Sequence, residues 1–142
     1  MLKSIEEASK NFCIHQIREP HTLNDGLTKE RTLIAYIDIK AVDMKKYRVY
    51  IAAEISFMQR VCMIFLEEEK SDEETLIDMT LETANLIIGS AKVIADNDEE
   101  SAFSIGTPNF EKFDTFDFEY DDAKTLAVEN DKISIAIKEL HG

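Results

Sequence analysis

Apolar residues recur at two different spacings in this chain, one typical of strands and one typical of helices. The order of these segments along the chain restricts its possible folds. Residues 32–40 and 44–53 are rich in β-branched and aromatic side chains with alternating polarity, which predicts two strands joined by a short loop. Apolar residues recur at helical spacing within residues 54–66, and another helix is predicted to start near Ser71. Further strands are predicted after it, at residues 103–107, 113–120, 125–130 and 132–140. This order lacks the regular βαβ rhythm of a parallel sheet.

The N-terminal part of the chain adds one more helix. Ser4 and Glu7 form a capping box, apolar residues follow at helical spacing, and the helix is predicted to end before Pro20. Residues 21–30 have the composition of a turn-rich connector. We therefore predict one α+β domain over residues 1–142, with a mostly antiparallel sheet and about three helices packed on it.

The charge of the chain excludes several classes of partner. Lys and Arg number 16 against 29 Asp and Glu, a formal net charge of -13, which repels phosphate backbones and anionic lipid heads. Cys13 and Cys62 lie in apolar helical patterns without CxxC spacing, as expected for free buried thiols in a reducing compartment. The first ten residues are too charged for the apolar core of a signal peptide, and no apolar run is long enough for a membrane span. We expect a cytoplasmic protein that binds neither nucleic acid nor membrane.

The helix after Ser71 carries two different stripes. Ser71 and Glu74 form a capping box at its start. At about 3.6 residues per turn, an apolar arc faces the core and consists of Ile77, Leu81, Ala84, Ile88 and Ala91, widened by Leu76, Thr80 and Ile87. A second stripe repeats the same 4, 3, 4 spacing well over a quarter turn away and consists of Asp78, Glu82, Asn85 and Gly89. We predict that this second stripe faces water or a partner.

Glu82 and Asn85 allow two interpretations. In the first they are ordinary solvated residues, which is the commoner situation for an exposed pair on a helix. In the second they form a site, because Asn is a poor helix-interior residue and Gly costs about 1 kcal/mol there relative to Ala. Two such residues on one exposed stripe favour a functional reason. Gly89 lets another chain approach closely, and an amide beside a carboxylate offers a donor and an acceptor together.

A family resemblance favours the second interpretation. The string ETANLIIGSAK, residues 82–92, resembles the E-x-x-N-x-x-x-G-x-A signature of the CheC/CheX family of chemotaxis phosphatases. A strand pair and a helix precede it, and FSIGTP, residues 103–108, is similar to the strand ending in a proline that follows the signature helix in the CheX branch. The signature occurs once, which is typical of the CheX branch. The resemblance therefore implies a CheC/CheX-like fold with one site per chain.

The resemblance also implies a reaction and a partner. It implies a phosphatase that acts on the phosphoaspartate of a CheY-like response regulator in bacterial chemotaxis or flagellar signalling. By resemblance, Glu82 pairs with the invariant lysine of the regulator, and the Asn85 amide orients the attacking water. Asp78 and Gly89 are expected to contact the partner. The regulator would bring the Mg²⁺, so this chain is expected to need no metal site, and its histidines show no metal-ligand spacing.

Other interpretations stay open. CheX-like proteins pair edge strands into a dimer, and the alternating C-terminal strands are our candidates for that pairing. One alternative function is a binding module for phosphorylated CheY or flagellar switch proteins, as in the middle domain of those switch proteins, which engages phosphorylated CheY or neighbouring subunits without hydrolysis. Another is a purely structural dimer. The acidic run at residues 67–74 either caps the helix and aids solubility or steers a basic partner. Four aromatic side chains are expected in the core or on a strand-pairing surface rather than in a ligand pocket: Phe113, Phe116, Phe118 and Tyr120.

Overall fold

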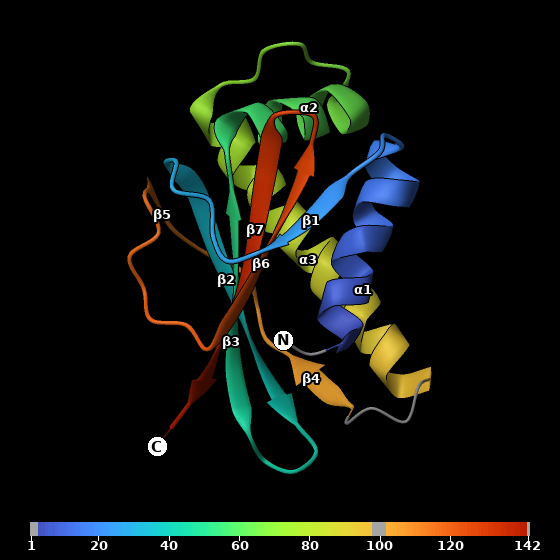
Figure 1. Ribbon diagram of the computed structural model, residues 1–142, viewed down its shortest axis with the longest axis vertical. Helices are drawn as coiled ribbons and strands as arrows, with labels where there is room; N and C mark the ends of the chain where they lie inside the picture. The colour runs from blue at the N-terminus through green and yellow to red at the C-terminus, as the bar shows by residue number, and fades with distance from the viewer. Residues whose placement is uncertain (1–2, 98–101, 142) are drawn as a thin grey trace.

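The computed structural model describes residues 3–97 and 102–141 and contains one seven-stranded sheet with helices on one face (Figure 1). The helices are α1 Lys3–Asn11, the π-helix η1 Phe12–Ile17, α2 Ile55–Leu66 and α3 Glu73–Asn97. The strands are β1 Thr22–Asp25, β2 Thr32–Ala41, β3 Lys46–Ala53, β4 Phe103–Ile105, β5 Asn109–Asp114, β6 Asp122–Val128 and β7 Asp131–Leu140. The predicted α+β class with a mostly antiparallel sheet is confirmed.

The order of strands in the sheet corrects one prediction. The order is β1-β6-β7-β3-β2-β4, with β5 also paired to β2, and every pair is antiparallel. The C-terminal strands β6 and β7 are therefore interior strands, because β7 lies between β6 and β3 while β6 lies between β1 and β7. Our prediction that they provide a pairing edge is wrong. The edges are β1 on one side and β4 with β5 on the other.

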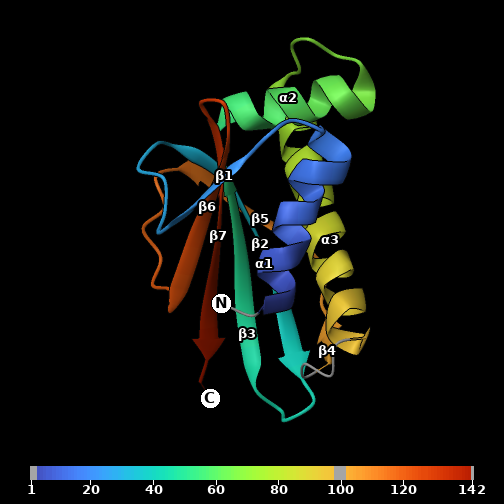
Figure 2. The same cartoon turned by 45° about the vertical axis from the view of Figure 1, so that its right-hand side comes forward.

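The main core lies between the sheet and the helices (Figure 2). Successive side chains of a strand point to opposite faces of a sheet. On β2, Leu33 and Ile37 join the core beneath the helices, whereas Ile34 and Tyr36 belong to a second cluster on the opposite face. Burial of β2 on both faces explains its nearly continuous apolar sequence.

A loop rather than a strand covers that opposite face. Phe116 and Phe118 pack against Tyr50 of β3, with ring centroids 5.0 and 5.1 Å away. The strand predicted at residues 113–120 is wrong after Asp114, because β5 ends at that residue. Aromatic and acidic residues alternate here because the aromatic rings pack on the sheet while the acidic side chains are exposed to water. The expectation that these rings pack on the sheet is confirmed for Phe116 and Phe118, whereas Tyr120 is exposed.

The two predicted capping boxes are both wrong. Ser4 is a buried residue inside α1 and does not precede the helix. At α3 the cap is Asp72, whose carboxylate accepts a hydrogen bond from the Thr75 N–H at 2.8 Å. The backbone of Ser71 is instead bonded to the side chain of Gln59, which accepts from the Ser71 N–H at 3.0 Å and donates to its carbonyl at 3.3 Å. These two bonds tie the start of α3 to α2.

Two further segments depart from their sequence pattern. The connector at residues 21–30 contains β1, which pairs with β6 so that Leu23 faces Leu126. Turn-forming residues surround Leu23 in the sequence, so nothing local predicts this strand. Two of the apolar residues that recur at helical spacing within residues 54–66, Ile55 and Phe65, are exposed on α2. The residues of α2 that are buried are Phe57, Met58, Val61 and Cys62.

Candidate functional site

Helix α3 positions the candidate site. It contains 25 residues, which is about 37 Å of helix, and it runs along the sheet beside α1 (Figures 1 and 2). Its buried face consists of Leu76, Met79, Thr80, Thr83, Ala84, Ile87, Ile88, Ala91 and Ala95. This burial holds the middle of α3 in a fixed orientation, so that side chains on its other face project from a rigid support.

The buried arc is rotated slightly from its predicted position. Ile77 and Leu81, expected in the core, are only half-buried, whereas Met79 and Thr83 are buried. Helix α1 packs beside α3, so more of the α3 surface is covered than the sheet alone would cover. The second stripe still faces outward, as predicted.

The second stripe lies on the outer face of α3, and we call its four residues Asp78, Glu82, Asn85 and Gly89 the α3 stripe. Asp78, Glu82 and Asn85 are exposed, and Gly89 is half-buried. Residues three and four apart on a helix are neighbours, with about 5–6 Å between their Cβ atoms. Glu82 and Asn85 are therefore close enough to contact one bound group together.

Neither polar side chain of the pair is engaged within its own chain. Over residues 3–97 and 102–141, no hydrogen bond or ion pair joins the Glu82 carboxylate or the Asn85 amide to another side chain. Both groups are therefore free to bind an external ligand. Neither side chain makes a contact that the fold needs, so its replacement is not expected to disturb the packing.

The α3 stripe is also electrostatically unfavourable on its own. Asp78 lies one turn before Glu82, and Glu74 lies one turn before Asp78, all three exposed. Like charges four residues apart on a helix destabilise it by about 0.2–0.5 kcal/mol per pair. No ion pair with a Lys or Arg offsets these three charges in the part of the chain that the structure describes. A cationic group of a partner would relieve this repulsion.

Gly89 has no role in the packing of its own chain. A Cβ atom built at Gly89 would meet no other atom within 4 Å. Since Gly lowers helix stability by about 1 kcal/mol relative to Ala, this residue reduces stability without allowing any closer packing within the chain. The open space above Gly89 is available to another molecule.

A small hollow next to the α3 stripe was not predicted from the sequence. Leu86 and Ser90 of α3 line it together with Phe12, His15 and Gln16 of η1, and its volume is about 110 Å³. Residues from η1 and α3 are far apart in the sequence, so only the packing of α1 on α3 brings them together. No periodic signal could have revealed it.

The described residues contain neither a metal-binding cluster nor a membrane-spanning helix. No group of three or more His, Cys, Asp and Glu side chains in residues 3–97 and 102–141 is arranged to hold a metal ion. Among the same residues, no helix has both the length and the apolar character needed to cross a bilayer. The α3 stripe presents two carboxylates, one amide and the open backbone at Gly89.

Solved structures match this architecture over nearly the whole chain. Searches with protein-family models and among curated protein sequences gave no match. The chemotaxis protein CheX from Vibrio vulnificus, however, has a TM-score of 0.79 at 14% identity, with 98% of each chain covered. The chain has the CheX fold. The fold that the ETANLIIGSAK string implied is thereby confirmed.

Two other structures widen this comparison. CheX from Borrelia burgdorferi, solved as a CheX-CheY-BeF3-Mg²⁺ complex, shares the CheX fold with a TM-score of 0.72 at 14% identity, covering 99% of this chain and 97% of that one. The middle domain of FliM from Vibrio alginolyticus is more distant, with a TM-score of 0.55 at 6% identity over 95% of this chain and 88% of that one. The CheX fold is thus the nearer of the two architectures.

Proposed function

We propose that this protein is a phosphatase that removes the phosphoryl group from the phosphoaspartate of a CheY-like response regulator. The observation that carries the proposal is the exposure of Glu82 and Asn85, without partners in the described chain, on the outer face of a helix that the sheet holds in place. The signature resemblance at residues 82–92 and the CheX-CheY complex of the Borrelia burgdorferi relative support it.

Glu82 and Asn85 can supply what the removal of the phosphoryl group requires of this chain. Phosphoryl transfer depends on positioning and on stabilisation of charge more than on covalent chemistry by the protein. We assign Asn85 to orient the attacking water, because an amide can hold a water in line through both its donor and its acceptor. We assign Glu82 to pair with a lysine of the regulator, since a carboxylate in an acidic row favours a cation.

The rest of the α3 stripe would receive the regulator. Gly89 lets the partner backbone come close, because no atom of this chain lies above it. Asp78 adds a second carboxylate one turn before Glu82 and strengthens the attraction for a basic surface. Under this proposal the Mg²⁺ is held by the regulator and this chain contributes no metal ligand.

A binding module for phosphorylated CheY or for flagellar switch proteins is the second candidate. It is favoured by the likeness to the FliM middle domain, although the lower TM-score makes that likeness the weaker one. The two candidates differ in one respect: the phosphatase accelerates decay of the phosphoaspartate, whereas the module binds and leaves the decay unchanged.

The experiment is the decay of a radiolabelled phosphorylated CheY-like regulator from the same organism, with and without this protein. Asn85→Ala and Glu82→Lys are expected to abolish the acceleration. Asn97→Ala and Glu73→Lys are matched controls, since they make the same changes to an exposed amide and an exposed carboxylate on the same helix outside the α3 stripe. Binding without acceleration would favour the module, and neither binding nor acceleration would reject both candidates.

We further propose that the protein forms a homodimer by pairing of edge strands. Edge strands carry unpaired N–H and C=O groups that a second copy can bind, and the edges here are β1 and the β4–β5 side. Light scattering at working concentration is expected to give twice the chain mass of 16.2 kDa. A monomer mass across the concentration range would contradict this proposal.

A further inference from the structure

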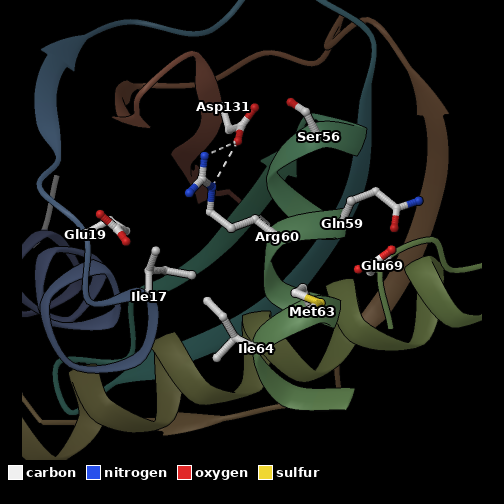
Figure 3. A pocket seen from close by; sticks show the side chains of 9 residues that line it. All are labelled: Ile17, Glu19, Ser56, Gln59, Arg60, Met63, Ile64, Glu69 and Asp131. Carbon is white, nitrogen blue, oxygen red and sulfur yellow. Dashed lines mark hydrogen bonds and ion pairs between the residues drawn. The ribbon is translucent and has the colours of Figure 1, made fainter. Parts of the chain in front are cut away.

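A groove along α2, away from the α3 stripe, contains residues that have no role in the phosphatase proposal (Figure 3). We define the α2 groove by Ile17, Glu19, Arg60, Met63, Ile64 and Glu69, which border a volume of about 560 Å³. None of the residues that line it belongs to α3. The groove is formed by α2, the end of η1 and the start of β7, so it is a separate surface.

Apolar side chains occupy one part of the groove. Met63 and Ile64 are 46% and 41% exposed, and the next two residues of α2, Phe65 and Leu66, are also exposed. Polar residues normally occupy the solvent face of a helix, and a run of this kind is expected only where another molecule covers it. Ile17, which is buried, extends the apolar surface from the η1 side.

The remaining charge of the groove is negative. Arg60 is neutralised, because its guanidinium contacts Asp131 at 2.7 Å and Glu129 at 3.3 Å. Glu19 and Glu69 lie on opposite sides of the groove, as Figure 3 shows, and neither has an ion-pair partner in the described part of the chain. The carbonyl end of the α2 dipole adds further negative potential beside Glu69.

We propose that the α2 groove binds a basic amphipathic segment of a partner protein. Its apolar side chains pack on Met63 and Ile64, and its Lys or Arg residues pair with Glu19 and Glu69. A second copy of this chain would bring the same carboxylates together, and an anionic lipid surface would meet the same repulsion. Charge complementarity therefore selects a cationic protein segment as the occupant.

The test uses a defined probe, a fluorescent synthetic helix of about 18 residues with Leu on one face and Lys on the other. Binding is measured by fluorescence anisotropy to the full chain and to two variants, Ile64→Ser and Glu69→Lys. We expect each variant to weaken binding by about tenfold. Val42→Ser and Glu119→Lys are matched controls at exposed positions outside the groove and are expected to bind as the unmodified protein does.

Four results would overturn the proposal. One is equal binding of a shuffled peptide with the same composition, and another is unchanged binding by both variants. The third is a dimer, seen by light scattering, that Ile64→Ser converts to monomer, which would make a second copy the occupant. The fourth is binding to anionic vesicles that Ile64→Ser removes. Thermal melting checks the fold of each variant, and Glu69→Lys, in an exposed loop, tests the groove even if Ile64→Ser fails to fold.

Discussion

At the residue scale, the α3 stripe consists of residues that lower the stability of the isolated chain. Asn85 and Gly89 are poor helix formers, and Asp78 repels Glu82. None of these residues has a compensating contact within the described chain. Positions where a local rule is broken without a structural gain are where function is expected. This is the physical argument for a site on this face of α3.

Gly89→Ala is expected to stabilise the protein. A Cβ at this position meets no atom within 4 Å, so the gain in helix propensity should raise the free energy of unfolding by about 0.5–1 kcal/mol. Urea denaturation measures it. Gly26→Ala is the matched control, because the space there is equally open but φ is +88°, so this substitution is expected to destabilise. Equal effects of the two substitutions would contradict our explanation.

The thiol of Cys13 is expected to be unreactive in the folded protein. Burial raises its pKa to about 11, and the thiolate is the reactive form. Burial also raises the pKa of Cys62. A thiol reagent at pH 8 should therefore modify both cysteines slowly in the native protein and rapidly after denaturation. Fast stoichiometric labelling of the native protein would contradict the burial of these side chains.

At the element scale, the start of α3 depends on one carboxylate. Asp72 accepts a hydrogen bond from the Thr75 N–H, and this bond lowers the pKa of its carboxyl group. A group whose pKa is lower in the folded state contributes stability that is complete above its unfolded pKa, about 3.9. That stability is lost as the pH falls through the folded pKa. The cap is therefore weaker in acid.

Asp72→Asn is expected to remove this acid sensitivity. Asn caps a helix about as well as Asp, but it does not titrate. The stability difference between the unmodified protein and the variant should be constant above about pH 5 and should then change in favour of the variant as the pH falls. Urea denaturation over a pH series tests it, with Asp72→Ala as the control that loses the cap at every pH. A difference that does not depend on pH would contradict the prediction.

The elements also show which features a sequence can predict. Long segments such as β2, β3, β7 and α3 carry enough periodic residues to define their type and their buried face. β1 and the loop after Asp114 were predicted incorrectly, because their conformation depends on remote partners: the edge of β6 for β1, and the open sheet face around Tyr50 for the loop. The cap at Asp72 was assigned one residue too early, since Gln59 binds the backbone of Ser71.

At the scale of the whole molecule, the two faces of the sheet have different roles. The helices cover one face and present α3 outward, while the loop containing Phe116 and Phe118 closes the other. The sequence alone indicated the α3 stripe, because all four of its residues lie on one helix. It could not indicate the α2 groove, which combines Ile17 of η1, Ile64 of α2 and Glu69 of the loop after α2.

The most direct test is the decay of the phosphorylated regulator while it is bound to a saturating amount of this protein. Saturation removes differences in affinity, so the rate constant reports only the step after binding. If Asn85 positions the attacking water, Asn85→Ala should lower this rate constant by about 100-fold, whereas Asn97→Ala should not change it. Equal rate constants for the unmodified protein and Asn85→Ala would contradict the assignment of a phosphatase site to α3.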